Sequence, residues 1–288
     1  MVPRMALAMT VTTDPAPPRP VTFDWDELNR LVRWVHQFAA AARGLIVVGG
    51  DKGGVGKTTV AYELAGALGA VLVDLDWTGG SATYKWGLDF ERVNLARSAA
   101  GLHLMPGHAV RPYRGPSRPD LVPGHPVLEN LERDDSACRA IAAGLRELAR
   151  TRLVVADTHP GMNNLTRAAV RESDVVASPV PLRSGEMRAL TKMLKDGLAS
   201  GGPLVIVPNM IRTPLSKRKL DRLTAILEPY PNVVRDLGNP ISASTVWEDR
   251  DGTSAVTLQR RAGIDTLRAR LEMLRAIVDI CRPLTVAA

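Results

Sequence analysis

A short glycine-rich segment carries the strongest chemical signal in this 288-residue chain. It reads Lys-Gly-Gly-Val-Gly-Lys-Thr-Thr over residues 52–59. Glycines let the backbone N–H groups of such a loop converge on a phosphate, because they carry no side chain and reach unusual backbone angles. Lys57 adds a point charge for the β- and γ-phosphates, and the Thr58 hydroxyl can bind Mg²⁺. The predicted nucleotide contacts in this loop are Gly53, Gly54, Val55, Gly56, Lys57, Thr58 and Thr59.

The elements on either side of the loop are those that a phosphate site needs. Residues 44–49 form an apolar run that predicts a strand, and residues 57–68 predict a helix that Gly69 ends. The N-terminus of such a helix adds its dipole to phosphate binding. Asp51 stands where the first glycine of such loops usually is.

Carboxylates occur at the ends of two further predicted strands. Asp74 and Asp76 lie at the end of the strand predicted for residues 70–75, and Asp157 follows the strand predicted for residues 152–156. An aspartate at a strand end is common, so each of the three is a candidate site residue only because the glycine-rich loop is also present.

The remaining chain alternates between strands and helices. Near-continuous apolar strands separated by helices indicate a mostly parallel, twisted sheet with helices on both faces, and ligands then bind at the carboxyl ends of the strands. Residues 101–126 contain six prolines and are predicted to be loop-like. Cys138 falls on the apolar face of a helix and is predicted to be a core residue. The other predicted strands are 174–180 and 204–207, and the other predicted helices are 134–150, 164–172 and 184–198.

Three regions make up the predicted domain organisation. Residues 1–22 are rich in proline and threonine and are predicted to be a flexible tail. Residues 23–42 predict a packing helix that Asp24 caps, too short for a separate helix-turn-helix domain. Residues 43–288 are predicted to form one α/β domain.

The whole segment 52–59 resembles the deviant Walker A box of the ParA/MinD family of P-loop ATPases, and the resemblance extends over roughly residues 43–285. It implies a mostly parallel P-loop fold, ATP and Mg²⁺ as cofactors, and a homodimer that forms on ATP. It also implies that Lys52 reaches across the dimer to the nucleotide of the other subunit, where it would stabilise charge in phosphoryl transfer.

The same resemblance assigns roles to residues outside the loop. Asp76 matches the aspartate that positions the attacking water, and Asp74 lies near the metal. Asp157 matches the Walker B aspartate that holds Mg²⁺ through water. Asn209 follows the strand 204–207 and matches an asparagine that contacts adenine, although a turn residue that ends a strand would explain it nearly as well.

Two segments depart from the pattern of the family. Trp77 and Thr78 stand where the first switch segment usually has Pro-Gln, and His159 stands in place of the first of two prolines in the second switch segment. Both changes lie beside the expected γ-phosphate, so they affect hydrolysis more than binding. His159 reads either as a pH-sensitive switch residue or as a plain substitution.

The net charge of +7 favours a polyanionic partner such as DNA, although an arginine excess is also what a GC-rich genome produces. The resemblance to the ParA branch implies an ATP-bound dimer that binds DNA non-specifically, and release on hydrolysis triggered by a ParB-like centromere-binding partner. A solvated helix face would explain either basic cluster equally well. The candidate phosphate contacts are Arg212, Lys217, Arg218, Lys219 and Arg222 in one cluster, and Arg260, Arg261, Arg268 and Arg270 in another.

Two other uses of the same scaffold stay open. A MinD-like ATPase acts at a membrane or cell pole, and residues 264–280 form an amphipathic stripe, although core packing explains such a stripe more often. A metabolic ATP-dependent synthetase is the other, while the two isolated cysteines argue against an iron–sulfur carrier. No apolar run approaches the ~18 residues of a membrane span. The two isolated cysteines suit a reducing cytoplasm, and the resemblance to the ParA branch implies association with the nucleoid.

Overall fold

The computed structural model describes residues 23–104, 110–212, 216–233, 237–248, 253–259 and 262–286. In these residues one six-stranded sheet has the order β3-β2-β4-β1-β5-β6, and all five strand pairings are parallel. The predicted α/β fold class is therefore confirmed. The strands are β1 (Gly44–Val48), β2 (Val71–Leu75), β3 (Asp120–Val122), β4 (Leu153–Thr158), β5 (Val175–Val180) and β6 (Leu204–Pro208).

Helices connect the strands, and those that were predicted from the sequence have bounds close to the predicted ones. The helix that follows the glycine-rich loop is α2 (Lys57–Leu68), and Gly69 ends it in a left-handed conformation. The others are α1 (Trp25–Ala41), α3 (Ala82–Trp86), α4 (Gly101–Leu104), α5 (Leu128–Leu131), α6 (Asp135–Thr151), α7 (Asn164–Arg171), α8 (Ser184–Lys195), α9 (Lys217–Leu227), α10 (Thr245–Glu248) and α11 (Ile264–Val286).

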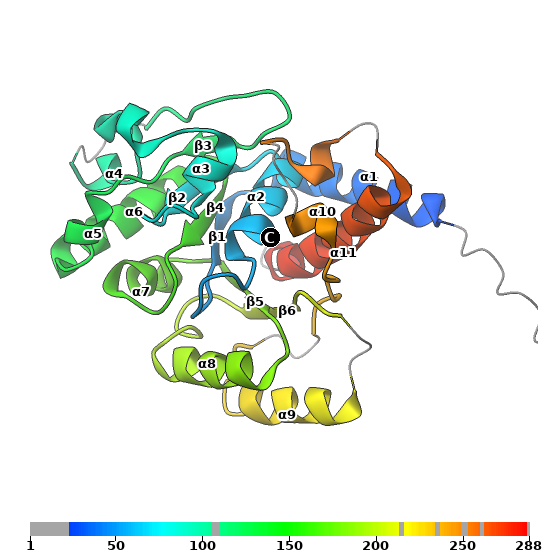
Figure 1. Cartoon of the computed structure of the whole chain (residues 1–288). Coiled ribbons are helices and arrows are strands. Elements are labelled where there is room, and N and C mark those ends of the chain that lie inside the picture. Colours follow the sequence, from blue (N-terminus) through cyan, green and yellow to red (C-terminus); the bar gives the residue numbers. More distant parts are fainter. Residues whose placement is uncertain are drawn as a thin grey trace, which may run out of the picture.

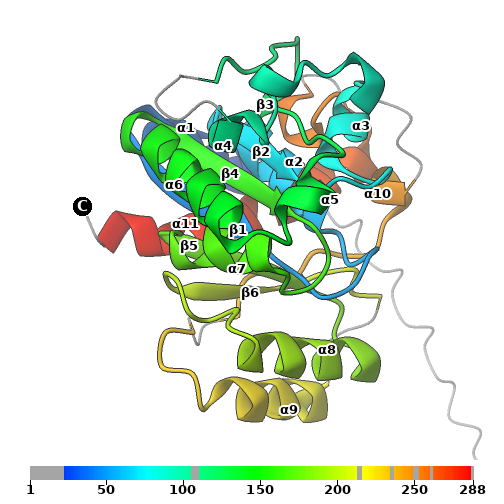
Figure 2. The ribbon, with the colours of Figure 1, turned by 90° about the vertical axis from the view of Figure 1, so that its left-hand side faces the viewer.

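Helices cover both faces of the sheet because side chains on a strand alternate between its two faces. Leu45 and Val47 of β1 pack with α6, α7 and α8 on one face, whereas Ile46 and Val48 pack with α1, α2 and α11 on the other. Figure 1 shows the two groups of helices on opposite sides of β1, and in Figure 2 helices α6 and α7 lie in front of the strands. Each face has its own buried core.

The region 101–126 is not entirely loop-like, so that prediction was wrong in part. The short strand β3 lies in it and pairs with β2, from Val71 opposite Asp120 to Val73 opposite Val122. Three residues are too few to show a periodicity, and the prolines around them hide the strand. The strand β3 forms because its backbone pairs with β2, and its own sequence does not predict it.

The helix α1 begins as its sequence predicts, because the Asp24 carboxylate accepts a hydrogen bond from the Glu27 amide at 2.8 Å. The Glu27 side chain forms an ion pair with Arg275 of α11. This pair and the apolar contacts of α1 attach the helix to the face of the sheet that carries α2 and α11. Residues 1–22, predicted to be a tail, lie outside the described part of the chain.

The apolar stripe of α11 is buried at Leu271, Leu274 and Ile277, whereas Leu267 is half-buried and Ile264 at the start of the helix is exposed. Met273, Ile277 and Ile280 have no exposed surface. The helix continues through Pro283 to Val286 rather than ending before it, because a proline in the last turn removes only one backbone donor. No helix in the described segments has the length and apolar character that crossing a membrane requires.

Candidate nucleotide site

The parallel sheet brings the predicted site residues to one edge. The loop 50–56 follows β1, which lies between β4 and β5, and Asp157 near the end of β4 pairs in register with both Val48 and Asp74. Asn209 directly follows β6. A cavity of about 320 Å³ opens at this edge. Its lining includes Gly53, Gly54, Gly56, Lys57, Thr58, Thr59, Asp76, Thr78 and Asn209.

Glycine at position 56 is required by its neighbours as well as by the turn. Its φ of 90° lies in the left-handed region, and a Cβ atom there would lie 2.2 Å from Nδ2 of Asn209. The Asn209 Nδ2 in turn donates to the Val55 carbonyl at 2.8 Å. Asn209 therefore fixes the loop from the side of β6, and it also lines the cavity.

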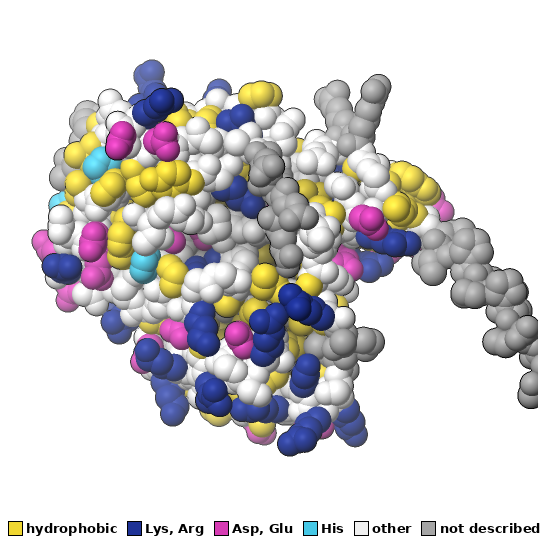
Figure 3. All heavy atoms as spheres, in the orientation of Figure 1, with side chains coloured by type: hydrophobic (Ala, Val, Ile, Leu, Met, Phe, Trp, Pro, Cys, Tyr) yellow, Lys and Arg dark blue, Asp and Glu magenta, His cyan; other side chains and the backbone are white. Residues whose placement is uncertain are grey.

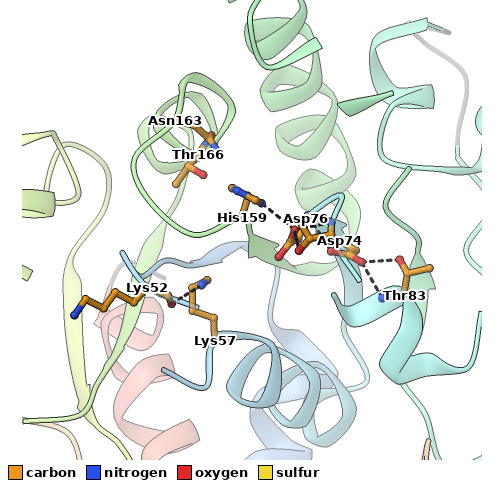
Figure 4. A network of polar contacts seen from close by, with 9 residues as sticks. Lys52, Lys57, Asp74, Asp76, Thr83, His159, Asn163 and Thr166 are labelled. Atoms are coloured by element: carbon orange, nitrogen blue, oxygen red, sulfur yellow. Dashed lines mark hydrogen bonds and ion pairs between the residues drawn. The ribbon is translucent and has the colours of Figure 1, made fainter. Parts of the chain in front are cut away.

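The two lysines of the loop are placed very differently. Lys57 is buried, and its Nζ donates to the Lys52 carbonyl at 3.3 Å. Burial lowers the pKa of Lys57, while the charges of Asp157 and Asp76 oppose that shift. Lys52 is exposed, and Figure 4 shows its side chain directed away from both Lys57 and Asp76. Lys52 therefore does not line the cavity of its own subunit.

Asp157 has the environment of a cation ligand. Its carboxylate is fully buried, and neither oxygen has a hydrogen-bond partner among the described residues. Burial and the nearby charge of Asp74 raise its pKa to about 8, although Lys57 opposes the shift. Buried carboxylate oxygens are normally paired or bound to a metal. Together with the Thr58 hydroxyl, this orphaned group supplies the oxygen chemistry that Mg²⁺ prefers.

Asp74 is fully buried but well satisfied. Its Oδ2 accepts from the Thr83 amide at 2.8 Å and from the Thr83 hydroxyl at 2.6 Å, and its Oδ1 accepts from the Asp76 amide at 3.0 Å. Burial raises its pKa to about 6 in spite of these bonds. Asp74 therefore anchors the start of α3, and its predicted place near the metal stays a prediction that its position beside Asp157 supports.

Asp76 stays ionised in the same environment. Burial alone would raise its pKa, but hydrogen bonds from His159 and Thr78 outweigh burial and lower it. The contact to His159 Nδ1 is 2.9 Å and the contact to the Thr78 hydroxyl is 2.7 Å. An ionised carboxylate at the cavity wall can orient a water molecule by accepting its hydrogen bond.

The far end of the cavity contains residues that sequence reasoning missed. Trp247 of α10 and Met273 of α11 line it together with Ile241. The indole Nε1 of Trp247 is buried without a hydrogen-bond partner among the described residues. These residues lie far along the chain from any motif, so only the tertiary fold identifies them.

The two predicted basic clusters also differ. Arg212 and the four cationic residues of α9 are exposed, whereas Arg270 is half-buried and donates to the Gln259 carbonyl at 3.1 Å. Arg268 lies 3.7 Å from Asp265. Arg260 and Arg261 fall outside the described residues. The structure adds a neighbouring set on α8 that was missed although its helical spacing was readable: Arg183, Arg188, Lys192 and Lys195.

The sheet is parallel, a glycine-rich loop follows an inner strand, and a helix follows that loop. A buried aspartate lies near the end of the adjacent strand. Together these features define a P-loop nucleotide-hydrolase fold. A scan against models of protein families found no match, and a search of curated protein sequences found none either. Comparison with solved structures places the chain further.

A variant of McdA from Cyanothece in complex with ATP aligns with a TM-score of 0.65 and 18% identity, over 84% of this chain and 96% of that one. A putative plasmid partition protein from Borrelia burgdorferi bound to AMPPNP aligns with a TM-score of 0.59 and 20% identity, over 82% and 98%. The septum site-determining protein MinD from Pyrococcus horikoshii, complexed with Mg-ADP, gives 0.59 and 16%, over 85% and 98%.

A cobyrinic acid a,c-diamide synthase from Mycobacterium smegmatis with bound ADP and magnesium also aligns, with a TM-score of 0.56 and 20% identity, over 75% and 91%. The fold of this chain is that of the ParA/MinD-type P-loop ATPases. The resemblance inferred from the loop 52–59 is therefore confirmed at the level of the fold.

Proposed function

We propose that this chain is an ATPase that binds ATP with Mg²⁺ in the cavity beside the loop 52–59. The observation that carries the proposal is the orphaned carboxylate of Asp157, buried within reach of the charge of Lys57. Thr58 and Asp157 would hold Mg²⁺, which would neutralise phosphate charge when bound. Gly53, Gly54, Gly56 and Thr59 line the phosphate end, and Asn209 faces the base.

Within that site the residues of the chain have distinct tasks. The ammonium of Lys57 binds the β- and γ-phosphates with the donors that its hydrogen bond to the Lys52 carbonyl does not use. The Asp76 carboxylate orients the attacking water. Lys52 points out of its own site, which fits its predicted contact with the nucleotide of a second subunit in an ATP-bound homodimer.

ATP turnover and nucleotide affinity measured separately test the site. Lys57→Ala removes the phosphate charge, so we expect it to abolish both. Asp76→Asn keeps the size of the side chain but weakens its hold on water, so turnover should fall by about 10- to 100-fold while affinity stays within threefold. Unchanged turnover in Asp76→Asn would contradict the assignment.

We further propose that the ATP-bound dimer binds DNA non-specifically and partitions it, and that a centromere-binding partner triggers hydrolysis and release. The support is a basic face made by α8 and α9, defined by Arg183, Arg188, Lys192, Lys195, Lys217, Arg218, Lys219 and Arg222. All eight side chains are exposed, and none forms an ion pair with another described residue. Figure 3 shows dark blue side chains gathered over this end of the molecule.

This basic face suits DNA better than the cluster near α11, where Arg270 is half-buried and Arg268 lies near Asp265. Unpaired cations on one face are what phosphate contacts need. Helix α11 does not favour a MinD-like role at a membrane, because much of its apolar stripe is buried in the core.

A further inference from the structure

Trp77 and His159, the two departures from the family pattern, meet in space. Trp77 belongs to the loop after β2, which we call loop A (residues 76–80), and His159 belongs to the loop after β4, which we call loop B (residues 159–162). Their rings are stacked, with centroids 4.0 Å apart and an interplanar angle of 7°. His159 also contacts the carboxylate of Asp76 through Nδ1, as Figure 4 shows.

Loop B is the fixed side of this contact. The Thr158 hydroxyl donates to the Val48 carbonyl at 2.9 Å, and the Gly161 amide donates to the Gly50 carbonyl at 3.1 Å. His159 therefore lies between two hydrogen bonds to β1 and the start of the nucleotide loop. Its ring is also mostly buried, with 24% of the side chain exposed.

Loop A is held much less firmly beyond Trp77. A Cβ atom added at Gly79 or at Gly80 would meet no atom within 4 Å, so packing does not confine that part of the loop. Thr78 bonds mainly to Asp76, two residues before it. Among the described residues, the Trp77 stacking and the hydrogen bond of Asp76 to His159 join loop A to loop B, and Trp77 also packs against the core.

The hydrogen bonds of Asp76 are concentrated on one oxygen. Oδ1 receives the Thr78 amide at 2.9 Å, the Thr78 hydroxyl at 2.7 Å and His159 Nδ1 at 2.9 Å. A carboxylate is an acceptor, so Nδ1 of His159 is the donor. No hydrogen bond to Oδ2 occurs among the described residues, which leaves that oxygen for a ligand at the cavity wall.

We propose that Trp77 and His159 form a latch between loops A and B, in which His159 is a positioning residue that holds Oδ1 of Asp76 so that Oδ2 accepts the attacking water. The proposal rests on the proposed ATPase function and deepens it. Trp77 keeps the imidazole plane in place, and the imidazole holds the carboxylate. Prolines at positions 77 and 159 would limit the movement of the two loops by fixing the backbone. In this chain the stacked rings of Trp77 and His159 limit that movement instead.

Three variants separate the parts of the latch. His159→Phe keeps a ring that can stack but removes the donor, and His159→Asn keeps a donor but removes the ring. Trp77→Leu removes the stacking and keeps an apolar side chain against the core. For His159→Phe we expect kcat to fall by about 10- to 100-fold, the range for a misplaced group, with KM unchanged. His159→Asn should recover a large part of that loss. Equal kcat in wild type and His159→Phe, or no recovery in His159→Asn, would overturn the positioning role.

A second measurement on nucleotide-free protein separates the latch from the ATPase proposal. The near-ultraviolet circular dichroism of Trp77, taken as the difference from Trp77→Leu, should persist in His159→Phe and decrease in His159→Asn. A Trp77 signal that His159→Asn leaves unchanged would overturn the latch even if the protein hydrolyses ATP. If the wild type hydrolyses no ATP but the Trp77 signal still decreases in His159→Asn, the proposed ATPase function is wrong and the latch is still supported.

Discussion

Three carboxylates within one edge of the sheet have different environments, and these environments separate their roles. Asp74 is satisfied by Thr83 and the Asp76 amide, and Asp76 is held ionised by His159 and Thr78. Asp157 is buried, and neither of its oxygens has a hydrogen-bond partner in the described part of the chain. Carboxylates whose pKa values are driven apart do different work. Anchoring, water orientation and cation binding are the tasks that these three environments fit.

The raised pKa of Asp157 predicts how stability depends on pH without nucleotide and Mg²⁺. The folded protein keeps a proton on Asp157 up to about pH 8, whereas an aspartate in the unfolded chain loses it near pH 4. The folded state therefore binds more protons between these values, and the free energy of unfolding falls as pH rises, by at most ~1.4 kcal/mol per pH unit for one group.

Asp157→Asn removes this dependence. Urea unfolding at pH 5 and pH 8 should show the variant gaining stability over wild type as pH rises. Glu147→Gln is the matched control, because Glu147 is exposed and pairs only with Arg150 at the surface. Parallel pH profiles for Asp157→Asn and wild type would contradict the buried, protonated state.

At the scale of elements, the long periodic segments could be predicted from sequence because burial on both faces of the sheet leaves continuous apolar runs. The loop 52–59 could be placed because its glycines are needed for backbone geometry, whichever fold surrounds them. The strand β3 and the residues at the far end of the cavity could not be predicted, because neighbours distant in sequence create them. Trp247, for example, reaches the cavity from α10.

One such long-range contact fixes α2, the helix behind the glycine-rich loop. Glu63 of α2 is fully buried, and its carboxylate accepts from the amides of Val256 and Thr257 at 3.0 and 2.9 Å. Glu63→Ala leaves these donors without their acceptor, so we expect the free energy of unfolding to fall by about 2–4 kcal/mol.

Denaturant unfolding of Glu63→Ala and of the exposed control Glu147→Ala measures this effect. The control should change stability by less than about 0.5 kcal/mol. A similar small change in both variants would show that the segment 255–258 does not depend on Glu63.

At the scale of the whole molecule, none of the eight residues of the basic face on α8 and α9 is among those that line the nucleotide cavity. If the basic face binds DNA phosphates, each lost contact lowers the slope of log K against log salt by about 1. Arg188→Glu with Lys192→Glu should therefore weaken DNA binding and flatten the slope by about 2.

Arg139→Glu with Arg171→Glu is the control for that pair, because it changes the net charge equally with exposed residues of α6 and α7. Fluorescence anisotropy of a labelled duplex over a salt series measures both. Equal weakening by the two pairs would mean that net charge, rather than the basic face, determines DNA affinity.

Dimer formation is the step that would couple the cavity to DNA, and Lys52 is the residue that tests it. Light scattering with a non-hydrolysable ATP analogue should give a dimer for the wild type. Lys52→Ala should remain a monomer with the analogue while still binding nucleotide, because its side chain points away from its own site. A dimer in Lys52→Ala would remove the role across the subunit interface.

The central claim is that ATP gates DNA binding. Retention on a DNA-coated surface is the direct measurement. It compares three samples: wild type with a non-hydrolysable ATP analogue, wild type without nucleotide, and Lys57→Ala with the analogue. We expect strong, salt-sensitive retention of the wild type with the analogue and loss of retention in the other two samples. Equal retention in all three would contradict it.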